Sequence, residues 1–315
     1  MKYVYKYAAL MLALLLCLTA LWGCGKEEPE AGQDNETQQD QEQGGQENPT
    51  PQLLSDTISC SDGETTLRFE RNEQGDWNWK DDTTFPLDNT YVRELLATAE
   101  QMLTLQPITT DKTPEDLGLD SEEKYVTATD EKGHRMTWYL GDRDDDGCYY
   151  MRVDGDETGA VYLAPAQLHA QISRSIYDMM LLPDLPSIPA AQMRSITITV
   201  GDKTTHTFPN SDGKWVIGIS SVNEEAQPML QALGSLRITS CVDYTPSEGA
   251  AAICGLNESS PRVELAYVTL NGADNTLTLT IGNARSNGYC VTMGEDTTIY
   301  LVSAELVDPI LSFIQ

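Results

Sequence analysis

Apolar side chains recur at helical spacing in two stretches of the chain, and each stretch follows a short segment that contains tryptophan, "DWNW" or "KWVI". In the first stretch, which begins behind Asp88 or Asn89 as N-cap, the residues that share one helix face are Val92, Leu95, Leu96, Ala99, Met102 and Leu103. In the second stretch, which begins at Asn223, they are Ala226, Met229, Leu230 and Leu233. The spacing predicts two amphipathic helices that each bury one side.

Segments of alternating apolar and polar residues follow both helices. "YVTATDEKGHRMTWYLGD" and "VELAYVTLNGADNTLTLTIGN" each predict a hairpin with a glycine turn, closing on Gly141 or Gly282. "CYYMRVDGDETGAVYLAPAQL" and "GYCVTMGEDTTIYLVSAEL" each predict a further hairpin that runs into a closing helix. Antiparallel hairpins beside segregated helices favour an α+β fold.

These paired segments lie at nearly constant separation along the chain. Gly118 and Gly255 are 137 residues apart, and Tyr162 and Tyr300 are 138 apart. We interpret this regularity as a tandem duplication of an antiparallel-sheet-plus-helices unit. The stretch "LLPDLPSIPAAQ" is punctuated by proline, so we place the first α+β repeat at residues 53–182, a proline-rich boundary at 183–192 and the second repeat at 193–315.

The N-terminus has the pattern of a secretory signal. Lys2 and Lys6 precede an apolar run over residues 8–22, and the run ends at "LWGC". This ending resembles a bacterial lipobox, which implies a lipoprotein signal peptide over residues 1–23 and lipid attachment at Cys24. Trp22 departs from the usual pattern, and the alternative is an uncleaved anchor helix. Either interpretation tethers the protein to the cell membrane, facing the extracytoplasmic side.

A polar segment separates this anchor from the repeats. Residues 24–52 lack aromatic and branched aliphatic side chains, and they hold one lysine against eight acidic residues. Such a composition buries too little apolar surface to offset the entropy of ordering, so we expect a disordered acidic stalk.

The charge balance of the chain is strongly acidic, with a formal net charge of −29 at pH 7. Nucleic acid is excluded as a partner class, because phosphate binding needs a basic patch and none is visible. Basic proteins, cations or a cationic wall polymer fit better. The alternative interpretation is that the acidic surface keeps an exported domain soluble.

The sharpest local motif is "DRDDDG", in which Asp142, Asp144 and Asp146 precede a glycine as in the opening of a calcium loop. The motif lies between two predicted strands and lacks the closing glutamate of an EF-hand, so a solvated turn is the competing interpretation. No cysteine and histidine spacing for structural zinc occurs, and we expect no cofactor. A Cys241 to Cys254 disulfide is one pairing open to an exported protein, although the sequence does not determine connectivity.

Two other groups of residues were candidates for chemistry. Aromatic side chains that could form a binding platform, or simply pack in the sheet, are Trp77, Trp79, Trp138, Tyr139, Tyr149 and Tyr150. The histidines are His134, His169 and His206, and none belongs to an HExxH motif. Nucleophile-elbow, Walker and dinucleotide-binding signatures are also absent from the sequence, so we expect no enzymatic activity.

The order of a tryptophan strand, an amphipathic helix, "GLD", a hairpin ending in "LG", a "YY" strand and "VYLAPAQL" resembles the bacterial domain-of-unknown-function family 4340. The resemblance runs from about Leu53 to the C-terminus. It implies an exported or lipid-anchored protein, with some relatives encoded beside ABC-type transport systems, and it supplies no catalytic residues.

These observations lead to one functional hypothesis and one alternative. We expect a lipid-anchored, extracytoplasmic, non-enzymatic binding or accessory protein, associated with a membrane transport protein of the ABC type. The alternative is a cell-wall glycan-binding protein or hydrolase that uses the aromatic and acidic surface.

Overall fold

The computed structural model describes residues 55–314 of the chain. The predicted signal peptide, the lipid-attachment residue Cys24 and the predicted stalk lie outside these residues. The described residues cluster into a single unit that spans Pro49–Gln315. Its architecture is α+β with two antiparallel sheets, as the hairpin patterns predicted.

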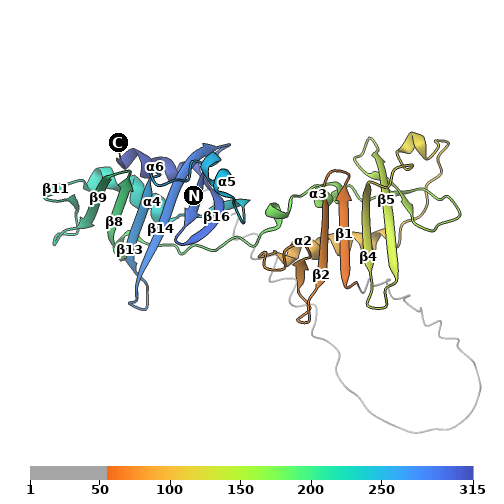
Figure 1. Cartoon of the computed structure of the whole chain (residues 1–315), viewed down its shortest axis with the longest axis horizontal. Helices are drawn as coiled ribbons and strands as arrows, with labels where there is room; N and C mark the ends of the chain where they lie inside the picture. Colours follow the sequence, from red (N-terminus) through yellow and green to blue (C-terminus); the bar gives the residue numbers. More distant parts are fainter. Residues whose placement is uncertain (1–54, 315) are drawn as a thin grey trace, which may run out of the picture. The chain divides into compact units, whose positions relative to one another are not determined.

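The first sheet has seven strands in the order β3-β2-β1-β4-β5-β6-β7 (Figure 1). Its strands are β1 (Thr57–Asp62), β2 (Thr66–Arg71), β3 (Trp77–Trp79), β4 (Lys124–Thr129), β5 (Arg135–Arg143), β6 (Tyr149–Val153) and β7 (Tyr162–Ala164). Strands β4 to β7 form the predicted four-strand meander.

The second sheet has nine strands in the order β11-β10-β9-β8-β13-β14-β15-β16-β12. Its strands are β8 (Met193–Val200), β9 (Lys203–Pro209), β10 (Trp215–Ile217), β11 (Ser220–Ser221), β12 (Ile238–Asp243), β13 (Arg262–Val268), β14 (Asp274–Arg285), β15 (Gly288–Met293) and β16 (Asp296–Ser303). The meander recurs as β13 to β16. Strand β12, which the sequence patterns did not predict, pairs with the edge of β16. The division of the chain at residues 183–192 stays a prediction, although no strand occupies that segment.

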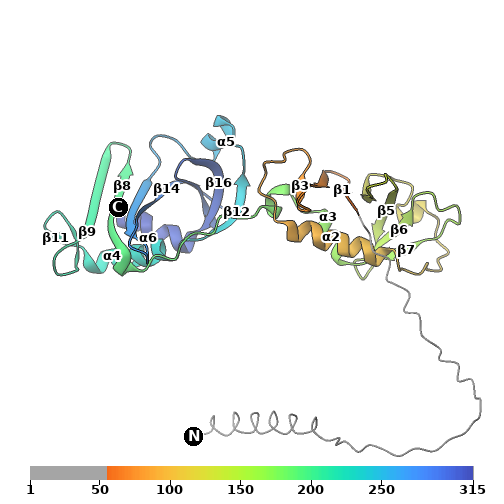
Figure 2. The ribbon, with the colours of Figure 1, turned by 90° about the horizontal axis from the view of Figure 1, so that it is seen from below.

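Helices cover one face of each sheet (Figure 2). Beside the first sheet lie α2 (Asn89–Met102) and α3 (Gln167–Ile172); beside the second lie α4 (Asn223–Gly234) and α6 (Ala304–Ile314), while α5 (Glu248–Ile253) is a short helix between β12 and β13. Short 3-10 helices occur at η1 (Glu115–Leu117), η2 (Ile176–Met179) and η3 (Ala190–Gln192). Within residues 55–314, no helix is both long and apolar enough to cross a bilayer.

The two long amphipathic helices bury the faces that the sequence predicted. In α2 the buried side chains include Val92, Leu95 and Ala99, and Asp88 is the N-cap, its carboxylate accepting from the backbone N–H of Thr90. In α4 the buried side chains are Ala226, Met229, Leu230, Ala232 and Leu233. Helix α4 has Val222 at its N-cap position, so Asn223 is not the cap.

Asn223 instead joins its helix to the preceding tryptophan strand. Its Oδ1 atom accepts from the backbone N–H of Trp215 at 3.3 Å, and Asn89 Oδ1 accepts from the backbone N–H of Trp77 at 2.5 Å in the other half. Both tryptophan side chains are buried. The same hydrogen bond therefore sets where each long helix starts relative to the sheet.

Gly141 and Gly282 occupy corresponding irregularities in β5 and β14. Each lies where the pairing register with the next strand shifts. A Cβ atom on Gly141 would lie 2.1 Å from the carbonyl oxygen of Leu117, and one on Gly282 would lie 2.1 Å from that of Cys254. Gly118 follows Leu117 and Gly255 follows Cys254, and the two glycines have φ values of 66° and 70°. This left-handed backbone conformation favours glycine. The "GL" motifs are therefore places where a helical turn touches the sheet.

This contact predicts the effect of alanine at either strand glycine. Gly141→Ala and Gly282→Ala should each lower the free energy of unfolding by roughly 1–3 kcal/mol, because a methyl group would force the helical turn away from the strand. Urea denaturation followed by circular dichroism measures the change. Gly249→Ala is the control, since its nearest neighbouring atom would be Ser247 Oγ at 3.8 Å and alanine favours its helix. Equal stability of all three variants would contradict the tight contact.

Candidate functional site

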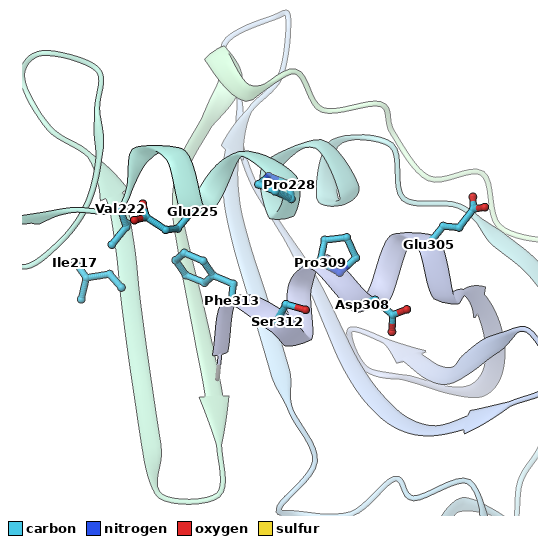
Figure 3. Close-up of a pocket in the computed structure, with 9 residues that line it drawn as sticks. All are labelled: Ile217, Val222, Glu225, Pro228, Glu305, Asp308, Pro309, Ser312 and Phe313. Atoms are coloured by element: carbon cyan, nitrogen blue, oxygen red, sulfur yellow. The ribbon is translucent and has the colours of Figure 1, made fainter.

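A groove lies between α4 and α6 on the covered face of the second sheet (Figure 3). We call it the α4–α6 groove, and its volume is about 700 Å³. The residues that line it are Ile217, Val222, Glu225, Pro228, Glu305, Asp308, Pro309, Ser312 and Phe313. It combines an apolar surface with carboxylates and has no basic side chain in its lining.

Each of the two helices carries a proline in this lining. Pro228 lies inside α4 and Pro309 inside α6. Because proline has no N–H, the backbone carbonyls of Glu224 and Glu305 lack the helical donor that would come four residues later. Residues four apart lie on the same helix face, so these carbonyl acceptors are on the side of the helices that bears the prolines.

The acidic side chains of the groove are accessible. Glu225, Glu305 and Asp308 are all exposed. Asp308 Oδ1 accepts a hydrogen bond of 2.8 Å from the Tyr289 hydroxyl, and this bond to the carboxylate raises the pKa of Tyr289. Asp308 is therefore held in place by β15, while the two glutamates have no ion-pair partner among the described residues.

The apolar part of the groove comes from the strand edge and the end of α6. Phe313 and Val222 are partly buried against the core, and Ile217 is exposed. Ile219, two residues beyond Ile217 in the turn to β11, is fully exposed. Large aliphatic side chains open to water beside a groove are typical of a surface that another molecule covers.

The corresponding helices of the first half are joined by polar contacts at equivalent positions. Glu94 lies five residues after Asn89, as Pro228 lies five after Asn223. Gln171 Nε2 donates to the backbone oxygen of Glu94 at 3.4 Å, and Arg174 Nη1 lies 3.4 Å from the Glu94 carboxylate.

The α6 side of the groove shows the same difference between the halves. When Leu306 is aligned with Leu168, Pro309 corresponds to Gln171, since each lies three residues later. Ser312 corresponds to Arg174, since each lies six residues later. Glu305 stands likewise at the position of Gln167, which donates to Gln101 at 3.2 Å. The groove thus occurs where the second half lacks the side chains that connect α2 to α3.

A second concavity, of about 470 Å³, lies at one end of the first sheet. We call it the polar pocket, and its lining residues are Asp62, Glu64, Lys124, Asp142, Arg143, Tyr149, His169 and Ser173. The Tyr149 hydroxyl lies 2.8 Å from His169 Nδ1, and Ser173 Oγ lies 3.3 Å from the same nitrogen.

The chemistry of the polar pocket is limited by these contacts. Desolvation is the main cause that raises the pKa of Tyr149, so its hydroxyl stays protonated at neutral pH. Tyr149 and Ser173 share one ring nitrogen, and within residues 55–314 no carboxylate is hydrogen-bonded to His169. A relay of hydroxyl, imidazole and carboxylate is therefore incomplete in this pocket.

The calcium candidates are not gathered into one site. Asp144 Oδ1 accepts from the backbone N–H groups of Asp146 at 3.0 Å and Cys148 at 2.8 Å, which closes the turn between β5 and β6. Asp142 lies against Gly118 and lines the polar pocket. Among the described residues no group of three or more His, Cys, Asp or Glu side chains could hold a metal ion. The motif forms a hairpin turn.

The aromatic candidates are divided between the core and the outer face of the first sheet. Trp77, Trp138 and Tyr149 are buried. Tyr139 and Tyr150 are only partly buried; the Arg152 guanidinium lies 4.1 Å from the Tyr139 ring centroid, and the Lys112 ammonium lies 5.6 Å from that of Tyr150. Trp79 packs edge-on against Phe85, so these aromatic residues do not form one continuous platform.

The two remaining histidines lie apart from both concavities. His134 pairs with Asp130 at 2.9 Å beside a turn, and His206 Nδ1 lies 3.0 Å from the Thr197 hydroxyl. Both histidines are exposed. Sequence patterns thus identified His169, Tyr149 and Asp142 as candidates, but not that they line one pocket, because they come from different elements.

The five described cysteines are free. Burial raises the pKa of Cys60 and of Cys241 to about 12, so both thiols stay protonated at neutral pH. Cys241 packs in the main core, whereas Cys254 packs in a separate small cluster. The structure therefore does not place Cys241 and Cys254 together.

Comparison with known proteins identifies a family but no characterised relative. The family model described as "Domain of unknown function (DUF4340)" matches residues 77–258, more than half of the chain. The match begins at the first tryptophan strand, ends just after the second "GL" motif and confirms the resemblance that the motifs indicated. No curated protein and no solved structure matches.

The buried thiols predict a loss of stability at alkaline pH. The ordinary thiol pKa is 9.0 and that of folded Cys60 is about 12, so the unfolded chain releases this proton first as the pH rises. The contribution of Cys60 is complete below pH 9.0 and should then fall by about 1.4 kcal/mol per pH unit until the folded pKa is reached.

Urea denaturation at about pH 8 and pH 10, under reducing conditions, measures this effect. Cys60→Ala should have a lower free energy of unfolding than the wild type at the lower pH. Between the two pH values, its free energy of unfolding should fall by less than that of the wild type. An unchanged fall in the variant would mean that the thiol ionises in the folded protein as it does in water.

Proposed function

Since the chain belongs to the DUF4340 family, for which no activity is assigned, we propose from its surface that it is a lipid-anchored extracytoplasmic accessory protein without enzymatic activity. In this proposal it binds a protein partner in the membrane through the α4–α6 groove. The observation that carries the proposal is the groove itself, an apolar surface with three exposed carboxylates between two helices that each carry a proline.

The chemistry of the groove selects a cationic occupant. Two other occupants of the groove would be a second copy of this chain and the predicted stalk. A second copy would bring a further net charge of −29 to the three carboxylates of the groove, and the stalk has one lysine against eight acidic residues. Both are disfavoured by repulsion. A segment with lysine or arginine beside apolar residues would pair with the carboxylates and cover the aliphatic side chains.

A membrane transport protein is the partner class that best fits the rest of the chain. The lipobox resemblance at Cys24 would place the protein at the outer face of the membrane, and the predicted stalk would let the folded part reach a neighbouring protein. The resemblance to relatives encoded beside ABC-type systems supports the same class.

A tandem duplication would explain why the groove exists in only one half. The shared tryptophan–asparagine hydrogen bond, the two glycine contacts with helical turns and the repeated four-strand meander support this origin. After duplication, one copy could keep its helices joined by polar side chains. The other copy would have replaced them with proline, serine and glutamate and so acquired a binding surface.

Lipid attachment is tested at the predicted cysteine. The wild-type protein should yield a lipid-modified N-terminal peptide that begins at Cys24, and Cys24→Ala should lose this peptide and keep residues 1–23, because both lipid attachment and cleavage need the Cys24 side chain. Fractionation and immunoblotting of intact cells, with mass spectrometry of the N-terminal peptide, measure the change. A wild-type N-terminal peptide that begins at Met1 and carries no lipid would contradict lipid anchoring and support the uncleaved helix.

The groove is tested by photo-crosslinking in intact membranes. A photoreactive residue in place of Ser312, in the groove, should yield an adduct with a membrane protein, while one in place of the exposed Ser259 should not. Glu225→Arg should reduce the Ser312 adduct roughly tenfold, because it repels a cationic segment. Its matched control is Glu224→Arg, an adjacent exposed glutamate that does not line the groove.

Three results would count against the proposal. They are the absence of a protein adduct at position 312, an equal effect of the two charge reversals, and an adduct composed of wall glycan. The last would favour the glycan-binding alternative.

A further inference from the structure

Cys254 and Cys290 come together across two elements of the second half, although 35 residues separate them in the sequence. With Ile299 they form a small buried cluster that is distinct from the main core. Cys254 is 6% exposed and Cys290 is 1% exposed. The two side chains pack in the same cluster, and after burial the Cys254 side chain is the next cause that raises the pKa of Cys290.

The backbone holds Cys254 in this position independently of the thiols. Its carbonyl oxygen accepts from the backbone N–H of Asn283 at 2.7 Å and occupies the space beside Gly282 where a Cβ atom would be. Gly282 and Asn283 form the irregular part of β14, between the paired residues Ile281 and Ala284.

Cys290 lies in the adjoining strand opposite this irregularity. In β15 it follows Tyr289, which pairs with Ala284, and precedes Val291, which pairs with Ile281. Cys254 packs against β14 at Gly282, and β15 is the strand next to β14, so the two cysteine side chains meet in one buried cluster.

The corresponding positions of the first half cannot form a cross-link. Leu117 corresponds to Cys254, because its carbonyl oxygen touches Gly141 as that of Cys254 touches Gly282. Tyr150 corresponds to Cys290, because it pairs with Leu163 as Cys290 pairs with Leu301. Apolar packing is thus sufficient at this point of the fold, and the cysteine pair is a feature of the second half.

We infer that Cys254 and Cys290 are a site of disulfide formation that links the turn after α5 to β15. The co-reactant is a disulfide donor, either a small-molecule disulfide or a disulfide oxidoreductase. The Cys254 thiolate attacks one sulfur of the donor and releases the first donor thiolate. The Cys290 thiolate then attacks the Cys254 sulfur and releases the second. The two thiol protons pass to the donor thiolates, so the donor is reduced by two electrons as the protein disulfide forms.

The surroundings of the pair define the order of these steps. Cys254 is the more exposed of the two, and it follows the short α5, whose last residue, Ile253, is 81% exposed. Local opening of α5 would admit the donor to Cys254. Burial raises the pKa of Cys290, and the Arg285 guanidinium opposes this shift, so Arg285 favours the thiolate needed for the second attack.

The test is a redox titration of the full-length protein, solubilised in detergent, with oxidised and reduced glutathione. After quenching with a maleimide, mass spectrometry without reduction should find the Cys254 peptide linked to the Cys290 peptide. Trypsin leaves Cys241 and Cys254 together between Arg237 and Arg262, so a second cleavage at Asp243 or Glu248 is needed to tell them apart.

Thermal unfolding gives an independent measurement of the link. Oxidation should raise the Tm by on the order of 5–10 °C, and a reductant should reverse the rise. Cys254→Ala should lose the response to oxidation, whereas Cys60→Ala, which removes a buried cysteine from the other sheet, should keep it.

The inference is overturned if both thiols remain alkylated by the maleimide under fully oxidising conditions. It is also overturned if Cys254 is found linked to Cys241, or if Cys254→Ala responds to oxidation as the wild type does. None of these measurements involves a binding partner, so their outcome is separate from that of the proposed groove.

Discussion

At Gly141 and at Gly282 a carbonyl oxygen occupies the place that a Cβ atom would take. This close approach fastens the helical turn at the "GL" motif to the second strand of each meander, where the pairing register shifts. Two features follow from it. In the first half Asp142 is placed in the polar pocket, and in the second half Cys254 is placed beside Cys290. One backbone contact thus positions side chains that differ in chemistry between the halves.

The helices lie at matching positions on the two sheets, but the side-chain contacts between them differ. The tryptophan–asparagine hydrogen bonds begin α2 and α4 at matching places on their sheets. Across the helix pair, however, Glu94 and Gln171 make a polar connection where Pro228 and Pro309 make none. A helix pair that is not tied by side chains leaves room for another molecule. For this reason the specific chemistry of the protein is concentrated where the halves diverge.

Most of the secondary structure was predictable from local patterns. Helical spacing identified the buried faces of α2 and α4, and strand alternation identified both meanders. Strand β12 was missed, because it pairs with β16 across a long separation and with irregular register. The start of α4 at Asn223 was predicted, but its hydrogen bond with Trp215 was not, because a local pattern does not include a tertiary bond.

By itself the sequence determined the α+β class, the apolar faces, the acidic charge and the family, because these depend on periodicity, composition and short motifs. The candidate sites were decided only by the tertiary structure. Gln171 and Pro309 are ordinary helix residues until a second helix lies beside them, and Cys254 and Cys290 are unrelated until β14 and β15 pair. Convergence of side chains from distant segments is set by strand register and helix packing, and neither is written in the spacing of residues along the chain.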